Sequence, residues 1–378
     1  MDLASLSTPS LILDHARFRK NVDRVYAKLL RHPGVSLRPH LKTVKSIDAA
    51  REIIRYGLNK ATVSTLREAE YFAENGVTDI LYAVAAAPAK LDRIGRLIDA
   101  GVRMCVVVDD IGVARSVTEW ARGRERPIGV MIEIDSDGHR SGVTPEDEKL
   151  IKIADALGAK EGVDFVGVMT HAGESYRCKT REAIADMAER ERSGAVGAAD
   201  RIRRAGIACN EVSVGSTPTF LFAKHLEGVT EARVGVAYLN DLTMAGLGVC
   251  GLEDIAISVL ATIIGHQRDK NRIIVDAGWM ALSSDCSAPS QRVFAGLGVV
   301  ADIGGRIIPG LGVLSANQEH GIISSADGGA LDFAGLPVGG RLRIYPNHAC
   351  ATAAAFREYK VVTSGDEVVA TWSRCAGW

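Results

Sequence analysis

Short apolar runs alternate with amphipathic segments from Ser10 to about Tyr238, and this rhythm constrains the fold more than any other feature of the chain. Such a pattern is typical of parallel strands that are buried on both faces and joined by helices. The segments between the runs have helical spacing, and one predicted helix is 181–204. Eight or nine runs occur, enough to close a (β/α)8 barrel of the TIM type: SLILD (10–14), LRPHLK (37–42), ATVST (61–65), ILYAV (80–84), VRMCVVVD (102–109), IGVMIEID (128–135), FVGVMTHAG (165–173), EVSVG (211–215) and EARVG (231–235). An open doubly wound sheet is the alternative, although no GxGxxG motif follows any of the runs.

The rhythm changes after about Met244, where short β-branched runs are punctuated by glycine. This pattern predicts a second domain made mainly of antiparallel strands. A length of 378 residues also agrees with two domains. We therefore expect a barrel over residues 10–243 and a β domain over residues 244–378, against which residues 1–9 pack.

The charge balance excludes several classes of partner. The chain has 45 basic and 46 acidic residues, so it lacks the positive charge that nucleic-acid binding requires. No run reaches about 18 consecutive apolar residues, the length of a membrane-spanning helix. The 7 cysteines are scattered without a CxxC pair, which favours a reducing, cytoplasmic setting over a disulfide framework. Small molecules or a second copy of the chain remain as expected partners.

Polar residues interrupt several of the predicted strands at the point where each strand ends. In a parallel barrel these carboxyl ends meet at one mouth, where functional groups cluster. The residues concerned are His40, Lys42, Asp135, His139, Arg140, Thr170, His171, Gly215, Ser216, Thr217 and Arg233.

Lys42 is the first candidate for chemistry. A lysine that is desolvated at a strand end loses its proton and attacks a carbonyl, as covalent attachment of pyridoxal phosphate requires. A surface lysine that begins the next loop is the alternative reading. The flanking residues of LRPHLKT do not decide between the two.

The segment SVGSTPT (213–219) is a candidate phosphate site. Its N–H groups at Gly215, Ser216 and Thr217 stand where a strand turns into a helix, which suits a phosphate. The same sequence also makes an ordinary helix N-cap, so both readings stay open.

His348 and Cys350, in NHAC (347–350), form a candidate metal pair. On a strand, residues two apart project to the same side, and imidazole with thiolate suits zinc. Two ligands make only half a tetrahedral shell, so water and a substrate oxygen would complete a catalytic site. A buried core cysteine is the alternative reading.

Taken together, these residues resemble the fold-type III pyridoxal phosphate enzymes, the group of alanine racemase, D-threonine aldolase and D-serine dehydratase. The resemblance covers the chain from TPSLILD to NHACAT, and MTHAG, SDGHRSG and EARVGVAYLN look like cofactor-lining segments of alanine racemase. It implies that Lys42 is the Schiff-base lysine, that Arg140 faces the phenolic oxygen and that His171 lies against the ring. Arg233 would lie near the pyridine nitrogen, with Tyr176 as a second candidate. The full cofactor-binding set is His40, Lys42, Arg140, His171, Tyr176, Gly215, Ser216, Thr217, Arg233, Gly235 and Tyr238.

A departure from alanine racemase predicts the reaction. The racemases carry a second acid/base, a tyrosine in GYADG, and the similar stretch here, DAGWMALSSD, has Trp279 at that place. Tryptophan does not exchange a proton, so we expect one-sided chemistry. D-Threonine aldolases carry His-x-Asp at the metal pair, whereas D-serine dehydratase and D-threo-3-hydroxyaspartate dehydratase carry His-x-Cys, as in NHAC.

The resemblance therefore implies a lyase that needs pyridoxal 5′-phosphate and a divalent metal, zinc or alternatively magnesium or manganese. Lys42, His348 and Cys350 would be catalytic, the last two as metal ligands, in the dehydration of a β-hydroxy D-amino acid such as D-threo-3-hydroxyaspartate or D-serine to a 2-oxo acid and ammonia. Aldolase cleavage is the alternative, and a non-catalytic cofactor carrier is a weaker one because such carriers lack a β domain. The family also implies a homodimer.

Three further residues could have either a functional or a purely structural role. His320 in ANQEHG and Asp276 in VDAG would line the substrate cavity or serve only as a loop histidine and a turn aspartate. Tyr238 would contact the phosphate or act as a core tyrosine with a satisfied hydroxyl.

Overall fold

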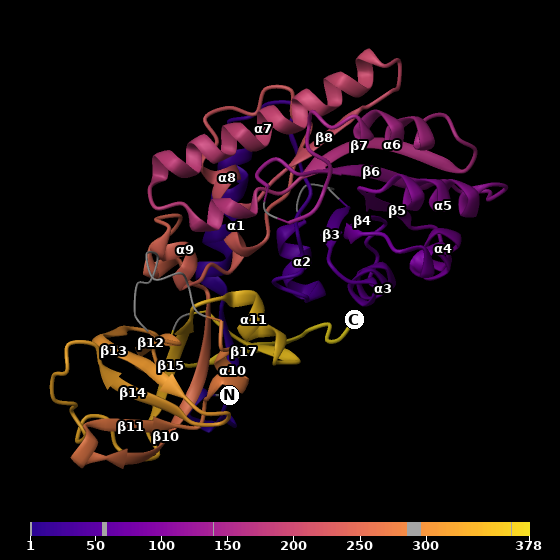
Figure 1. Cartoon of the computed structure of the whole chain (residues 1–378). Coiled ribbons are helices and arrows are strands. Elements are labelled where there is room, and N and C mark those ends of the chain that lie inside the picture. The colour runs from indigo at the N-terminus through magenta and orange to yellow at the C-terminus, as the bar shows by residue number, and fades with distance from the viewer. Residues whose placement is uncertain (1, 55–58, 139, 286–295, 364) are drawn as a thin grey trace. The chain divides into compact units, whose positions relative to one another are not determined.

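A computed structural model describes residues 2–54, 59–138, 140–285, 296–363 and 365–378. The described residues divide into two compact units. One unit contains residues 26–42 and 53–235, with the last two residues of the chain, and we call it the barrel unit. The other contains residues 1–25, 43–52 and 236–376, and we call it the β unit. Figure 1 labels their elements.

The barrel unit is built on one parallel sheet whose strand order is β2-β9-β8-β7-β6-β5-β4-β3. A bridge between His40 and Thr62 joins the first strand to the last, so the sheet closes into the predicted barrel. The open doubly wound alternative is therefore wrong. The strands are β2 (Ser36–Leu37), β3 (Lys60–Val63), β4 (Asp79–Ala85), β5 (Arg103–Val108), β6 (Ile128–Ile134), β7 (Val163–Thr170), β8 (Glu211–Val214) and β9 (Glu231–Ala232).

Burial explains why these runs are continuously apolar. Every residue of β6 is buried, as expected for a strand covered on both faces. Helix α7 packs on β7 and β8, as Figure 1 shows, and its bounds match the predicted segment 181–204. The helices between the strands are α2 (Ile47–Ile53), α3 (Leu66–Glu74), α4 (Leu91–Asp99), α5 (Ile111–Ala121), α6 (Lys149–Leu157), α7 (Arg181–Arg204) and α8 (Thr217–Phe222).

The β unit contains a mainly antiparallel sheet, as predicted, with strand order β11-β14-β13-β12-β15-β10-β1-β16-β17. Its strands are β1 (Ser10–Asp14), β10 (Ile257–Gln267), β11 (Arg272–Val275), β12 (Gly298–Ala301), β13 (Ile307–Ala316), β14 (Gly321–Ser325), β15 (Arg341–Pro346), β16 (Glu358–Val362) and β17 (Val368–Ser373). Its short helices are α9 (Leu242–Gly246), α10 (Trp279–Leu282) and α11 (Ala349–Ala354), and α1 (His15–Leu29) begins in this unit.

Strand β1 differs from its prediction. The run SLILD was placed in the barrel, but β1 pairs antiparallel with β10 and parallel with β16 in the β unit. The reason is that its three central residues are buried, and burial on both faces looks the same in either kind of sheet. Leu3 and Leu6 pack in one core cluster with Ile12 of β1.

Candidate active site

Lys42 lies just beyond the short strand β2, in the turn that follows the bridge between His40 and Thr62. The N–H of His40 donates to Val234 O at 2.7 Å, which continues the pairing of this segment with the chain after β9. The N–H of Lys42 in turn donates to Nδ1 of His40 at 3.4 Å. The lysine is partly buried, so it is neither a fully solvated loop residue nor a core residue.

Two imidazoles in the barrel unit stay uncharged. Burial, with the charges of Lys42 and Arg233, lowers the pKa of His40 well below its ordinary value. Burial and the charge of Lys42 also lower the pKa of His171 to about 3, although a hydrogen bond to Gly215 opposes this shift. Nδ1 of His171 lies 2.8 Å from Gly215 O, so this nitrogen carries the proton of the neutral ring.

Arg140 and Tyr176 belong to segments that interact with His171, Arg140 in a loop and Tyr176 in the short 3-10 helix Gly173–Arg177. Arg140 is exposed, and its charge contributes to the lowered pKa of His171. The ring of Tyr176 is 6.1 Å from the His171 ring, at an interplanar angle of 34°. The barrel unit thus gathers Lys42, Arg140 and Arg233 around two neutral imidazoles, a cluster of cations that suits an anionic ligand such as a phosphorylated cofactor. His139 lies outside the described residues.

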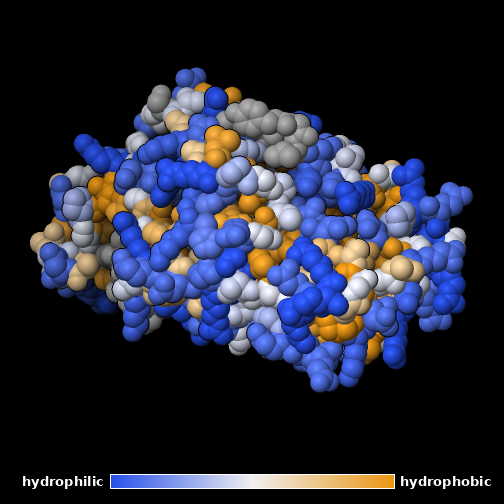
Figure 2. Space-filling view, turned by 90° about the horizontal axis from the view of Figure 1, so that it is seen from above, coloured by the Kyte–Doolittle hydropathy of each residue, from blue (hydrophilic) through white to orange (hydrophobic). Residues whose placement is uncertain are grey.

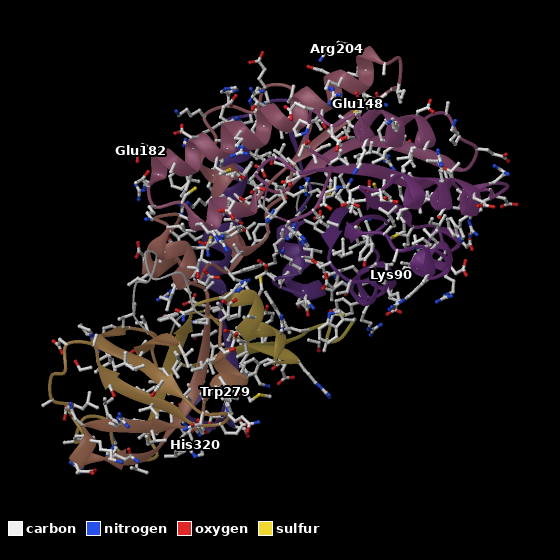
Figure 3. All side chains as sticks on the ribbon, viewed as in Figure 1. Lys90, Glu148, Glu182, Arg204, Trp279 and His320 are labelled. Carbon is white, nitrogen blue, oxygen red and sulfur yellow. The ribbon has the colours of Figure 1, made fainter. Side chains whose placement is uncertain are left out.

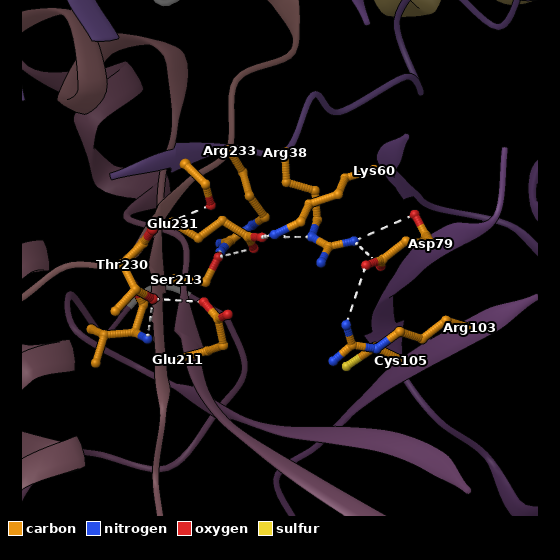
Figure 4. Close-up of polar contacts among 12 residues, drawn as sticks. Arg38, Lys60, Asp79, Arg103, Cys105, Glu211, Ser213, Thr230, Glu231 and Arg233 are labelled. Atoms are coloured by element: carbon orange, nitrogen blue, oxygen red, sulfur yellow. Dashed lines mark hydrogen bonds and ion pairs between the residues drawn. The ribbon is translucent and has the colours of Figure 1, made fainter. Parts of the chain in front are cut away.

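Arg233 is buried and held by the protein itself. Its Nη1 donates to Ser213 Oγ at 2.5 Å and its Nη2 donates to Thr170 O. Ser213 Oγ donates to Glu231 Oε1 at 2.8 Å, and the other oxygen of Glu231 accepts from Arg38 Nε at 2.8 Å. Figure 4 shows this chain of contacts across the barrel interior.

Arg38 extends this series of hydrogen bonds to Asp79, the first residue of β4. Its Nη1 donates to Asp79 Oδ1 at 2.6 Å, beside a cavity that Arg103, Cys105 and Glu231 also line. Although burial disfavours its charge, the carboxylates of Glu231 and Asp79 raise the pKa of Arg38 above its ordinary value. The buried charges therefore form a network that ends at Arg233.

The turn of SVGSTPT leads from β8 into α8. Gly215 has φ +145°, and a Cβ there would lie 2.2 Å from Arg233 O, so only glycine fits this approach of two strand ends. The N–H of Ser216 donates to Thr219 Oγ1 at 3.1 Å, and Ser216 Oγ accepts from the N–H of Thr219, which is the N-cap reading. The N–H of Gly215 donates to Glu191 Oε1 at 3.3 Å. The structure thus shows internal partners for two of the three proposed phosphate donors.

Glu191 is a site residue that the sequence reasoning missed. It lies on the buried face of α7, and its Oε1 accepts from the N–H groups of Ala172 and Gly215 at 2.8 and 3.3 Å. Burial raises the pKa of this carboxyl group. The signal was present in the sequence, because Glu191 falls within the apolar stripe that Ala188 and Ala195 define on α7.

The predicted metal pair lies in the β unit, but not on a strand. β15 ends at Pro346, His348 is the N-cap of α11 and Cys350 lies in its first turn. The geometry of alternating strand side chains is therefore wrong here. The two residues are nevertheless in contact through a side-chain hydrogen bond.

Three polar groups surround the pair. Hydrogen bonds with Cys350 and Asp285, together with the charge of Asp241, raise the pKa of His348 to about 10, although partial burial opposes this shift. Nδ1 of His348 lies 2.5 Å from Asp285 Oδ2. Sγ of Cys350 lies 3.1 Å from Oγ1 of Thr43, the residue that follows Lys42 in the chain. Imidazole and thiolate side by side are a donor set that fits a zinc-like divalent ion.

The structure places the three remaining candidates, Asp276, His320 and Tyr238, in different surroundings. Asp276 accepts from Thr8 Oγ1 at 2.5 Å and from the N–H of Thr262 at 2.7 Å, which is the structural reading of this aspartate. His320 is exposed in the loop between β13 and β14 (Figure 3). Tyr238 is fully buried in the segment after Gly235, and its carbonyl accepts from the side chain of Asn21.

Comparisons with known proteins identify the family of the chain. The sequence profile of the alanine racemase N-terminal domain matches residues 13–241, and that of a serine dehydratase domain matches residues 256–362. The chain belongs to the alanine racemase N-terminal domain family. It is 47% identical over its whole length, and over 99% of the relative, to D-threo-3-hydroxyaspartate dehydratase of Delftia sp. strain HT23. It is 30% identical to D-serine dehydratase of Dictyostelium discoideum, with 100% of this chain and 98% of the relative covered.

Solved structures of this family have the same fold. The dehydratase from Delftia sp. HT23 superposes with a TM-score of 0.94 at 46% identity, with both chains fully covered. A C353A mutant of D-threo-3-hydroxyaspartate dehydratase in the metal-free form gives a TM-score of 0.95 at 46% identity, again with full coverage of both chains. D-Threonine aldolase from Filomicrobium marinum gives 0.85 at 25% identity, covering 99% of this chain and 96% of that one.

These findings confirm the predicted family, the predicted fold and the predicted enzyme class. Dehydratases and aldolases are both lyases, and the chain is a lyase of this family. Within the described residues, no helix is long and apolar enough to cross a bilayer. Figure 2 shows a face on which hydrophilic residues predominate, with smaller groups of hydrophobic ones between them.

Proposed function

We propose that the protein dehydrates a β-hydroxy D-amino acid, with D-threo-3-hydroxyaspartate as the preferred substrate and D-serine as the second, and releases a 2-oxo acid and ammonia. The contact of His348 with Cys350 in the first turn of α11 carries this proposal, because it supplies a nitrogen and a sulfur donor for a metal. The 47% identity to D-threo-3-hydroxyaspartate dehydratase supports the choice of substrate.

Two groups from outside the chain would take part. Pyridoxal 5′-phosphate, when bound, accepts the negative charge that forms at the α-carbon of the substrate. A divalent ion, when bound, is a Lewis acid for the β-hydroxyl group that leaves as water. We propose zinc rather than magnesium or manganese, since thiolate is a soft ligand.

Lys42 would hold the cofactor covalently and, once released by the substrate amine, remove the α-proton. His171 supports this role as a neutral ring: its Nδ1 donates to Gly215 O, which leaves Nε2 as an acceptor. Arg233, anchored on Ser213 Oγ and Thr170 O, would keep its place near the pyridine nitrogen while the chemistry proceeds. Arg140 would face the phenolic oxygen.

His348 and Cys350 would hold the metal. Thr43 supports this role of the pair, because its Oγ1 lies 3.1 Å from Cys350 Sγ. Trp279 supports one-sided chemistry, since an indole cannot return a proton to the opposite face of the α-carbon as a racemase requires.

We also propose a homodimer, as the family resemblance implies, and a cytoplasmic location. The latter is supported by the cysteines of the sequence, which are scattered without a CxxC pair. Light scattering on the purified protein would test the dimer.

The product assay tests the proposed reaction. The protein, loaded with pyridoxal phosphate and zinc, is incubated with D-threo-3-hydroxyaspartate, D-serine and D-threonine, and keto acid, ammonia and aldehyde are measured in parallel. Equal amounts of keto acid and ammonia without aldehyde are expected. Glycine with aldehyde would identify an aldolase instead, and a rate that EDTA leaves unchanged would exclude the metal from the reaction.

A further inference from the structure

Asp285 is the acidic residue whose side chain meets His348 most directly. Its Oδ2 lies 2.5 Å from Nδ1 of His348. Both side chains are about half exposed, at 50% and 43%. Asp285 follows α10, and His348 is the N-cap of α11, so the contact joins these two segments. The sequence analysis did not predict it.

Two hydrogen bonds hold the segment that leads to Asp285. The N–H of Asp285 donates to Ser283 Oγ at 3.0 Å, and Ser283 itself ends α10 with φ +69°. Oγ1 of Thr352 in α11 donates to Leu282 O at 2.7 Å, which ties the end of α10 to α11. Asp285 therefore meets His348 from a segment that is held to the same helix.

The contact leaves one ring nitrogen of His348 for a metal. An imidazole has two nitrogens, and a carboxylate that accepts a hydrogen bond from Nδ1–H fixes the proton there. Nε2 is then the ring nitrogen that remains for an ion, and His348 also shares a side-chain hydrogen bond with Cys350. The unprotonated Nε2 would hold an ion, while the Nδ1–H would stay with Asp285.

Asp241 is the other acidic neighbour of His348, and its side chain accepts hydrogen bonds from the backbone. Its Oδ1 accepts from the N–H of Met244 and its Oδ2 from the N–H of Ala349, both at 2.9 Å, so it caps α9 and anchors the start of α11. Among the described residues, no group of three or more His, Cys, Asp and Glu side chains is arranged to hold a metal ion. Asp285 accordingly acts through His348 and not as a third ligand.

We propose that Asp285 is a positioning residue that holds His348 in its Nδ1–H form and so directs Nε2 to the divalent ion. This inference rests on the proposed function, which makes His348 a metal ligand. Carboxylates that orient a ligating histidine typically contribute 10- to 100-fold to metal affinity.

Zinc affinity of the cofactor-loaded protein tests the inference, measured by competition with a chromophoric chelator. Asp285→Ala should bind zinc about 10- to 100-fold more weakly than the parent protein. Asp285→Asn should recover most of that loss, because an amide oxygen also accepts from Nδ1–H. Asp269→Ala, which removes an exposed carboxylate elsewhere in the β unit, is the matched control and should bind as the parent does.

Three results would overturn parts of the account, and they can be told apart. Parent-like affinity of Asp285→Ala would refute the positioning role. An Asp285→Asn variant as weak as Asp285→Ala would show that the carboxylate itself is a ligand. If His348→Ala binds zinc as tightly as the parent, the metal site of the proposed function is wrong and the inference falls with it. Since Asp285 is half exposed, all its variants should keep the thermal midpoint of the parent, which confirms that they fold.

Discussion

Oγ1 of Thr43 lies 3.1 Å from Sγ of Cys350, although the two residues are 307 positions apart in the chain. Thr43 is fully buried and directly follows Lys42. A hydroxyl at this distance stabilises a thiolate by donating to it, and a thiolate is the form of cysteine that binds a metal. Thr43 therefore supports the metal-binding form of Cys350 from the residue next to the proposed catalytic lysine.

Replacing Thr43 by valine should weaken zinc binding about fivefold to tenfold, because it keeps the shape of the side chain but removes a hydrogen bond worth about 1 kcal/mol or somewhat more. Thr43→Ser, which keeps the hydroxyl, should stay within about twofold of the parent. Chelator competition measures both. Equal affinities of the valine and serine variants would show that the hydroxyl does not matter.

Glu231 should be the most costly single residue to neutralise in the barrel interior. It is 1% exposed and accepts from Arg38 and from Ser213, so Glu231→Gln leaves the Arg38 charge poorly compensated. We expect the free energy of unfolding to fall by about 3 kcal/mol, as measured by urea denaturation.

The exposed pair Arg306 and Asp302 provides the control, since Asp302→Asn should cost no more than about 0.5 kcal/mol. In the double variant Arg38→Met with Glu231→Gln, the free energy of unfolding should fall by less than the sum of the two single-variant losses. The difference should be at least about 1 kcal/mol. Strict additivity of the two changes would mean that the residues do not interact energetically.

His171 should make the cofactor-free protein sensitive to acid. Its pKa is about 3 in the folded chain against an ordinary value of 6.5, so below pH 6.5 the unfolded chain takes up a proton that the folded chain cannot. Stability from this group is complete above pH 6.5 and is lost as the pH falls towards 3. His171→Asn removes the titration, and between pH 6.5 and 4 the parent should lose about 1 kcal/mol per pH unit more than the variant. Parallel urea-denaturation curves over this range would contradict the assignment.

The barrel was predictable because strands such as β5 and β6 are nearly continuous apolar runs and helices such as α7 have one buried apolar face. α7 illustrates this, since its predicted and observed limits coincide at 181 and 204. β1 shows the limit of the same signal. Its run is equally apolar, but whether a buried strand pairs in a parallel or an antiparallel sheet depends on partners far away in sequence, here β10 and β16.

The sequence allowed the residues of the candidate site to be selected, but not the contacts that these residues make. His348 and Cys350 were selected by their chemistry, but the alanine-rich segment that follows favours a helix, so they meet at the start of α11 and not along a strand. Thr43 and Asp285 were missed because a threonine and a half-exposed aspartate are ordinary residues in any sequence. Only the fold brings them to Cys350 and His348.

The central claim is that the Lys42 amine carries the cofactor. Borohydride reduction of the cofactor-loaded protein, followed by proteolysis and mass spectrometry, tests it directly by locating the modified residue. The account predicts a single phosphopyridoxyl group on the peptide that contains Lys42, and none in Lys42→Ala. A modified peptide that lacks Lys42, or an unmodified chain that still turns over substrate, would contradict it.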